Sequence, residues 1–377
     1  MEKIKVGLSV SLTGVYSVQG KESFQGVSLW VADVNKEGGI FVRECGKKIP
    51  VELIYFDDAS SPDNCRANTE RLASVEKVDI LLGPYSSSLS LASAEVAEER
   101  GVTLWNHGGS TDEIEEKGFT CLVSAITPAS RYAEGIIKLL RARDPDAGKI
   151  AAFSAENSGF SRNVARGARL YGEESGFLVR EYKFATGSED FSQLLDEAAD
   201  FSPDLILGMG RAHDDLALAR QIIERRVRAN AIALVVASIK LFKDTFRQSA
   251  EGFISGSQWE SGINITPDFG PKPLEFLARF KSAYGVEPDY VAAQGYNIGL
   301  VVHKCIEEAG TLDDTELRER AKDTEFKTFY GRFSVDRKGS QTGHEMVVIQ
   351  WQNGKKVIVH PERYSEARVL YPMRPAY

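Results

Sequence analysis

Three consecutive serines, residues 86–88, lie between an apolar run that ends at Gly83-Pro84 and a helical pattern that begins at Leu89. A helix that starts there leaves its first backbone N–H groups without partners, at the positive end of its dipole. One serine is enough to cap such a helix. The additional hydroxyls leave two interpretations open at this point: plain capping, or a site for a carboxylate or another anion.

The segment 106–114, NHGGSTDEI, has the same form after the next apolar run. Its glycines allow close approach of the backbone, and Asp112 and Glu113 suit the first turn of a helix. Two helix starts with hydroxyls on neighbouring strands could hold one carboxylate between them. The local sequence leaves open whether Ser110 or Thr111 is only an N-cap.

Motifs for catalysis, cofactors and metals are missing from the sequence. The turn GMGRAHDD at 208–215 lacks the third glycine of a dinucleotide fingerprint, and HEMVV at 344–348 is not H-E-x-x-H. Neither a G-x-S-x-G elbow nor a G-x-x-x-x-G-K loop occurs. The five histidines are dispersed, and only His107 and His213 lie just after predicted strands. We therefore expect no enzymatic activity, no cofactor and no bound metal.

These turns belong to an alternation of short strands and amphipathic helices, which predicts parallel sheets covered by helices on both faces. In the first half, strands are predicted at 3–10, 51–58, 79–83, 101–106 and 120–125, with helices at 22–37, 64–75 and from 89 onward. The pattern restarts at Pro128, with strands at 149–155, 178–184, 204–210 and 233–238. Two such units in tandem indicate two lobes.

The last third of the chain departs from the alternation. Two long helices are predicted through 276–284 and 290–309, a shorter one near Leu317, and antiparallel strands within 331–361. Because no flexible linker separates the lobes, we expect the chain to cross between them more than once.

The composition is that of a globular protein of about two domains, with 377 residues, 42% of them hydrophobic and 27% charged. A net charge of -8 argues against nucleic acid as a partner. No apolar run approaches the roughly 18 residues of a membrane span. The start, MEKIKVGLSV, enters a strand directly, so a cytosolic chain and a chain whose signal peptide has been removed both remain open.

The four cysteines, Cys45, Cys65, Cys121 and Cys305, are far apart and form no C-x-x-C pair. This spacing gives little support to a zinc site or a redox motif. Cys305 lies in an apolar helical pattern and is expected in the core. The disulfide state of the other three stays open.

Five segments carry a family resemblance: IKVGLSVSLTGVYSVQGKESFQG, VADVNKEGGI, IYFDDASSPDNCRANTERL, DILLGPYSSSLSLASAEVAEERGVTLWN and QWQNGKKVIVHP. In this order they resemble the periplasmic solute-binding proteins of branched-chain amino acid ABC transporters, the type I periplasmic binding proteins. The resemblance implies an α/β fold of two doubly wound parallel-sheet lobes joined by three crossings, with a ligand enclosed as a hinge closes. We assign residues 1–125 and 257–335 to the first lobe, and 126–256 and 336–377 to the second.

The resemblance also implies binding residues. In the family a serine of the GPxSS turn and the turn after the next strand hold the ligand's carboxylate, which here implies Ser87 with Ser86 adjacent, and the segment 108–110. Positions that pack on the ligand fall at Gln19, Phe160 and Arg211, and only Phe160 is aromatic.

The acid that usually pairs with a ligand's ammonium group should follow ALVVA, where this chain has Ser238, Ile239 and Lys240. Asp214 or Asp215 could replace it. Arg211 is expected to pair either with one of these acids or with the ligand, and the second case favours acids that lack an α-amino group.

We therefore expect a solute-binding protein that captures a small carboxylate-bearing ligand and delivers it to an ABC permease from a periplasmic or other extracytoplasmic location. The alternative is a cytosolic amide or amino-acid sensor with the same lobes. The expected partners are this ligand and the permease subunits, without nucleic acid, and the chain is expected to be a monomer. The candidate ligand-binding residues are Tyr16, Gln19, Tyr85, Ser86, Ser87, His107, Gly108, Gly109, Ser110, Phe160, Arg211, Ser238 and Trp259.

Overall fold

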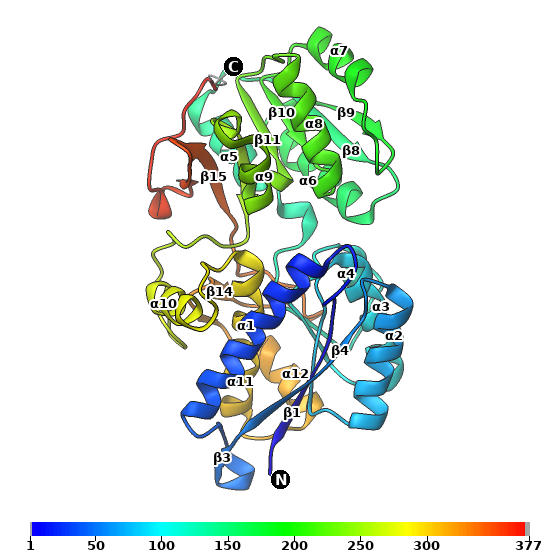
Figure 1. Ribbon diagram of the computed structural model, residues 1–377, viewed down its shortest axis with the longest axis vertical. Helices are drawn as coiled ribbons and strands as arrows, with labels where there is room; N and C mark the ends of the chain where they lie inside the picture. Colours follow the sequence, from blue (N-terminus) through cyan, green and yellow to red (C-terminus); the bar gives the residue numbers. More distant parts are fainter. Residues whose placement is uncertain (1, 374–377) are drawn as a thin grey trace. The chain divides into compact units, whose positions relative to one another are not determined.

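The computed structural model describes residues 2–373, and the chain divides into two compact units (Figure 1). Unit 1 comprises Met1–Pro128 and Asn264–Glu345, and unit 2 comprises Ala129–Ile263 and Met346–Tyr377. The chain therefore passes between the units three times. The passages lie at 128/129, 263/264 and 345/346, where the sequence led us to expect 125/126, 256/257 and 335/336.

Unit 1 is built on a five-stranded parallel sheet. In spatial order its strands are β4 (Val51–Asp57), β1 (Ile4–Val10), β5 (Ile80–Leu82), β6 (Leu104–Asn106) and β7 (Leu122–Ser124). Helices α1 (Ser17–Lys36) and α11 (Tyr290–Ala309) pack together on one face, and α2 (Pro62–Arg71) and α3 (Ser87–Arg100) on the other (Figure 1). The smaller elements are β2 (Ile40–Val42), β3 (Lys47–Ile49), α4 (Glu113–Glu116), α10 (Pro273–Tyr284), α12 (Asp314–Asp323), β13 (Phe326–Lys327) and β14 (Arg332–Phe333).

Unit 2 repeats this design and extends it. Its parallel strands follow the order β9 (Leu178–Phe184), β8 (Lys149–Ala155), β10 (Leu205–Gly208), β11 (Ala231–Leu234) and β12 (Ile254–Ser257). Strands β15 (Val347–Gln352) and β16 (Lys355–His360) then add in antiparallel fashion. The helices are α5 (Glu134–Arg143), α6 (Gly159–Glu174), α7 (Ser192–Phe201), α8 (Ala212–Glu224) and α9 (Lys240–Phe246). Both units are thus doubly wound, as predicted.

The cores follow the apolar periodicity of the sequence. Strand β1 is almost wholly buried, and Trp30 on the inner side of α1 is 1% exposed. Cys305 is fully buried, which confirms its expected place in the core, and all four thiols are free. Within residues 2–373, no helix is both long enough and apolar enough to cross a membrane.

One predicted strand, 233–238, is wrong in its second half. Strand β11 ends at Leu234, and residues 235–238 form a 3-10 turn. The Asp215 carboxylate accepts the N–H of Val236 at 3.2 Å, and the Trp351 indole donates to the carbonyl of Ala237 at 2.8 Å. Side chains from elsewhere in unit 2 therefore bond the backbone groups that the predicted strand would have used.

The passages between the units lie later in the sequence than expected because hydrogen bonds and an ion pair hold each flanking segment in the unit that precedes the passage. Ser124 N–H donates to the carbonyl of Gly339 at 2.8 Å, and the Thr127 hydroxyl lies 2.6 Å from Nδ1 of His344, which keeps residues 336–345 in unit 1. Lys356 pairs with Glu260 at 2.9 Å, which keeps the segment after β12 in unit 2.

Candidate functional site

The strand order of unit 1 reverses between β1 and β5, because β4 lies on one side of β1 and β5 on the other. Open α/β sheets bind ligands at the carboxyl ends of the strands on either side of such a reversal. The loops concerned here are residues 11–16 after β1 and 83–86 after β5, followed by 107–112 after β6. The two hydroxyl-bearing turns of the sequence, 83–88 and 106–111, therefore lie at or next to the expected position.

The turns after β5 and β6 are bonded directly to each other. Tyr85 forms a parallel bridge with Gly108, and the N–H of Ser86 donates to the carbonyl of Gly108 at 3.2 Å. A Cβ on Gly108 would lie 2.4 Å from the carbonyl oxygen of Pro84, and one on Gly109 would lie 2.3 Å from Cβ of Ser90. Only glycine permits this approach.

The serines of the two turns have different partners. The Ser86 side chain caps α3 by accepting the N–H of Leu89 at 3.4 Å, and the Ser87 hydroxyl accepts the N–H of Thr111 at 3.2 Å. Ser110 is 6% exposed, and its hydroxyl has no hydrogen-bond partner within residues 2–373. Capping therefore accounts for one serine and leaves hydroxyls available at the start of α3.

Ser86 has an unusual backbone conformation, with φ 90° and ψ 147°. Non-glycine residues rarely adopt this conformation, which stores on the order of 1–3 kcal/mol and occurs mainly at binding and catalytic sites. A cap alone does not require it, since N-cap residues normally have extended backbone. The strain supports a binding role for this turn.

His107 lies directly before the glycine turn and is 2% exposed. Its Nε2 is 2.7 Å from the Ser23 hydroxyl on α1, and its Nδ1 has no hydrogen-bond partner in the described chain. Burial lowers the pKa of His107 to about 4, so the imidazole is neutral at neutral pH. Its place in the interior favours a supporting role beneath the turn.

Asn106 is a residue of this site that we did not predict. Its side chain accepts the N–H of Gly109 at 2.9 Å and donates to the carbonyl of Gly109 at 2.7 Å. It therefore shapes the turn that presents Ser110. An asparagine at the end of a strand, directly before two glycines, was the available signal.

Tyr16 is held by a loop from another part of unit 1. The Ser60 hydroxyl accepts the N–H of Tyr16 at 3.0 Å and donates to the carbonyl of Thr13 at 2.8 Å. The rings of Tyr16 and Tyr85 meet edge to face, with centroids 6.2 Å apart. Two of the predicted aromatic residues are thus brought together beside the serine turns, and Gln19 follows on the first turn of α1.

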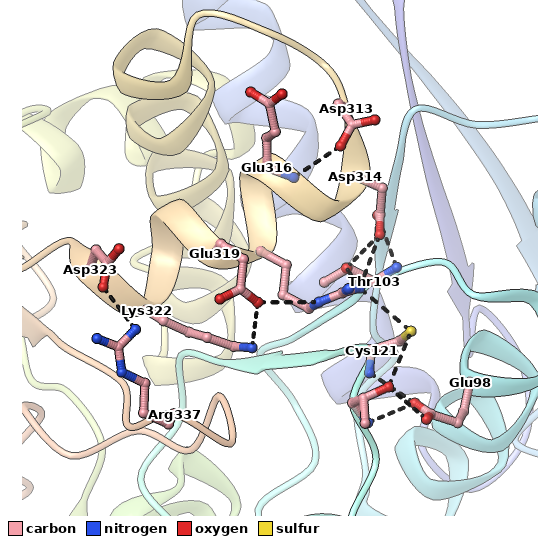
Figure 2. Close-up of polar contacts among 12 residues, drawn as sticks. Glu98, Thr103, Cys121, Asp313, Asp314, Glu316, Glu319, Lys322, Asp323 and Arg337 are labelled. Atoms are coloured by element: carbon pink, nitrogen blue, oxygen red, sulfur yellow. Dashed lines mark hydrogen bonds and ion pairs between the residues drawn. The ribbon is translucent and has the colours of Figure 1, made fainter.

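Polar residues at the opposite end of the same sheet are bonded to one another (Figure 2). Asp314 on α12 accepts both the N–H and the hydroxyl of Thr103, at 2.9 and 2.7 Å, just before β6. Glu98 accepts the N–H groups of Thr120 and Cys121 at 2.8 Å, just before β7. These groups hold the amino ends of the strands.

In unit 2 the four predicted residues all follow the carboxyl ends of parallel strands. Phe160 meets Tyr132 edge to face at 5.4 Å, and the Tyr132 hydroxyl accepts from Gln258 at 3.1 Å. Ser238 ends the turn after β11 and is 4% exposed, and Trp259 follows β12 and is 1% exposed. Their contact with a ligand stays a prediction, as it does for the nine residues of unit 1.

The expected pairing of Arg211 with a neighbouring acid is wrong. Asp214 and Asp215 are fully buried, and Arg211 is exposed at the start of α8. Asp214 accepts the N–H groups of Arg211 and Gly187, and Asp215 accepts that of Gly210. Burial raises the pKa of Asp215 to about 7. Because both carboxylates are turned inward to backbone groups, neither replaces the missing partner of a ligand's ammonium group.

Comparisons with known proteins agree with this arrangement. The sequence profile of the periplasmic binding proteins matches residues 3–356. A curated relative, Leu/Ile/Val-binding protein homolog 7 of Brucella abortus, is 25% identical over 98% of this chain and 94% of its own.

Two solved structures show the same fold. The substrate-binding protein LivJ of a branched-chain amino acid transporter from Streptococcus pneumoniae, in complex with isoleucine, is 22% identical with a TM-score of 0.78, over 98% of this chain and 100% of that chain. A solute-binding protein of an ABC transporter from R. palustris, in complex with benzoate, is 18% identical with a TM-score of 0.75, over 95% of each chain. The profile match over residues 3–356 shows that the chain belongs to the periplasmic binding protein family, and the strand order and the three passages between two units agree with this.

Proposed function

We propose that this protein captures a small carboxylate-bearing ligand outside the cytoplasm and delivers it to the permease of an ABC importer. The observation that carries the proposal is the joined pair of turns at the carboxyl ends of β5 and β6, with the unpartnered hydroxyl of Ser110 and the strained Ser86. Relatives of the family that bind isoleucine or benzoate bind ligands with a carboxylate, which supports this choice.

The chemistry follows from the turns. A carboxylate at the start of α3 gains from the helix dipole and from charge-assisted hydrogen bonds with the hydroxyls of Ser87 and Ser110. Tyr16 and Tyr85 supply an apolar wall for the rest of the ligand. We further propose that unit 2 closes over the bound ligand by a hinge, which removes water and strengthens these bonds.

The test compares Ser110→Ala with Ser88→Ala, because Ser88 is exposed two residues into the first turn. A thermal-shift screen of amino acids, aliphatic acids and aromatic acids supplies a ligand, and calorimetry measures its dissociation constant. We expect Ser110→Ala to weaken binding about 10- to 100-fold, which corresponds to about 1.5–3 kcal/mol for a hydrogen bond to a charged group. Ser88→Ala should bind like the parent.

Unfolding midpoints of both variants must match the parent for this comparison to be read. If Ser110→Ala and Ser87→Ala both bind like the parent, the carboxylate is held elsewhere and the proposal fails.

A further inference from the structure

We infer that Ser23 is a positioning residue of the carboxylate site and acts through His107 on the turn at residues 108–110. The inference rests on the proposed function, in which this turn and the start of α3 hold the carboxylate of the ligand. It adds a residue of α1 to that site. Ser23, His107 and the turn all belong to unit 1, so the argument needs no group from unit 2.

Within residues 2–373, the imidazole of His107 forms one hydrogen bond. Its Nε2 lies 2.7 Å from the Ser23 hydroxyl, and its Nδ1 has no hydrogen-bond partner. Both side chains are buried, at 1% exposure for Ser23 and 2% for His107. A neutral imidazole has one N–H and one acceptor nitrogen, and a hydroxyl can bond with either. The bond to Ser23 therefore fixes both the orientation of the ring and its tautomer.

Ser23 is itself held in place by the close packing of α1 against α11. A Cβ on Gly295 of α11 would lie 2.3 Å from the carbonyl oxygen of Ser23, and one on Gly26 of α1 would lie 2.0 Å from that of Ala292. The two helices thus meet backbone to backbone on one face of the sheet (Figure 1). Because either helix would clash if it moved along the other, the Ser23 hydroxyl has a fixed position beside His107.

The turn at residues 108–110 directly follows His107, so a shift of His107 moves the turn. Along the edge of the sheet the turn is joined to its neighbour by the bond from the N–H of Ser86 to the carbonyl of Gly108. The bond between His107 and Ser23 joins it to a different layer, that of α1 and α11. Groups that bind a ligand must be held to within about 0.5 Å by the bonds around them. Without the Ser23 hydroxyl, the ring can turn and the hydroxyl of the turn loses its fixed position.

A serine and a histidine are costly choices for a contact that serves stability alone. A buried polar atom without a partner is unfavourable, and Nδ1 of His107 is such an atom in the described chain. An apolar pair of similar size would avoid this cost, as Val27 and Trp30 do on the same helix, at 0% and 1% exposure. Local costs of this kind are typical of residues that serve a functional site. The pair therefore fits a role in binding better than a role in stability.

Hydrogen exchange measured by NMR tests the inference without a ligand. The N–H groups of Gly109 and Thr111 are bonded to side chains, and their exchange reports on the turn. We expect Ser23→Ala to speed both exchange rates by at least about tenfold. The imidazole nitrogen resonances of His107 should show two tautomers in this variant and one in the parent. Ser28→Ala removes a half-buried hydroxyl from the same helix and should change neither signal.

Calorimetry measures the consequence for binding, with isoleucine and benzoate as probes. We expect Ser23→Ala to weaken the tighter of the two by about 5- to 20-fold, at a temperature where all variants are folded. In a His107→Leu background, Ser23→Ala should cause no further loss, because the bond is already absent. Ser23→Cys keeps a weak donor of similar size and should bind the probe more tightly than Ser23→Ala does.

Unchanged exchange at Gly109 and Thr111 in folded Ser23→Ala would overturn the inference. Unchanged affinity in Ser23→Ala would also overturn it, provided that Ser110→Ala weakens binding. If Ser110→Ala and Ser87→Ala both bind like the parent, the proposed function fails instead. If neither probe binds the parent, the exchange rates decide alone, and if Ser23→Ala does not fold, Ser23→Cys replaces it with a smaller effect in the same direction.

Discussion

The two ends of the unit 1 sheet differ in how fully their polar residues are bonded. At the amino ends of the strands, carboxylates bond to neighbouring backbone and hydroxyl groups: Asp79 accepts the N–H of Lys5 at 2.8 Å. Asp314 accepts two bonds from Thr103 (Figure 2).

At the carboxyl ends, Asp57 likewise accepts the N–H groups of Leu12 and Ala59, both at 2.9 Å. The Ser110 hydroxyl there, however, has no partner in the described chain, and Ser86 has a strained backbone. Paired groups stabilise the fold, whereas the unpaired hydroxyl and the strained backbone support the proposed place for a ligand.

Unit 2 shows the same contrast with other residues. At its amino ends Asp204 accepts the N–H groups of Gly148 and Lys149, at 2.8 and 3.0 Å. At its carboxyl ends Arg211 is exposed and free of ion pairs among residues 2–373. Asp214 and Asp215, also at the carboxyl ends, are bonded to backbone N–H groups, so in unit 2 the contrast is carried by Arg211.

The largest expected effect is an exception to this contrast between the two ends of the sheet. His107 lies at the carboxyl ends of the unit 1 strands, yet we expect it to influence the stability of the fold. Its pKa falls from 6.5 to about 4 on folding, so the unfolded chain binds the extra proton between these values. The free energy of unfolding should therefore rise with pH from about 4 to 6.5, by up to about 3 kcal/mol from this residue. His107→Gln should remove this part of the slope in urea unfolding measured across that range.

Comparing the parent with His107→Gln cancels the titration of groups common to both. If the free energy of unfolding depends on pH in the same way in the parent and in His107→Gln, the imidazole is charged or solvated in the folded protein.

A smaller expected effect on stability tests the polar residues at the amino ends of the unit 1 strands. Asp314→Ala removes the acceptor for both groups of Thr103, so we expect the free energy of unfolding to fall by about 2 kcal/mol. The dissociation constant of the ligand should stay within about twofold. Glu316→Ala, at an exposed position on the same turn of α12, should change the stability by no more than about 0.5 kcal/mol. A large loss of affinity in folded Asp314→Ala would mean that the two ends are coupled.

The smallest expected effect concerns Tyr16, whose hydroxyl has no hydrogen-bond partner in residues 2–373 while its ring meets Tyr85. Tyr16→Phe keeps the ring, so stability should change by less than about 0.5 kcal/mol and affinity by less than about threefold. Chemical unfolding and calorimetry check both values. A tenfold loss of affinity would indicate that the Tyr16 hydroxyl forms a hydrogen bond with the ligand. Tyr16 would then make a polar contact in addition to its apolar one.

Many of the helices and strands could be predicted because the spacing of apolar residues along the chain indicates which side of each element is buried. Helices α1 and α11 and strands β1, β8 and β16 occupy ranges close to those expected from their apolar spacing. The GPYSSS and NHGGST turns could be located because glycine and serine follow strand ends. These features depend only on residues within about ten positions of one another.

The tertiary structure alone decided the polar pairing, because each partner is brought by a different strand or loop. The bond from Tyr16 to Ser60 spans 44 positions, and the ion pair of Glu260 with Lys356 spans 96. Asp214 and Asp215 follow Arg211 by three and four positions in the sequence, yet both carboxylates point inward to backbone N–H groups at the start of α8. Opposite charges that are close in the sequence predict an ion pair. Leaving a buried backbone N–H without a hydrogen-bond partner costs more free energy than leaving an exposed guanidinium unpaired, so here the carboxylates bond to N–H groups instead.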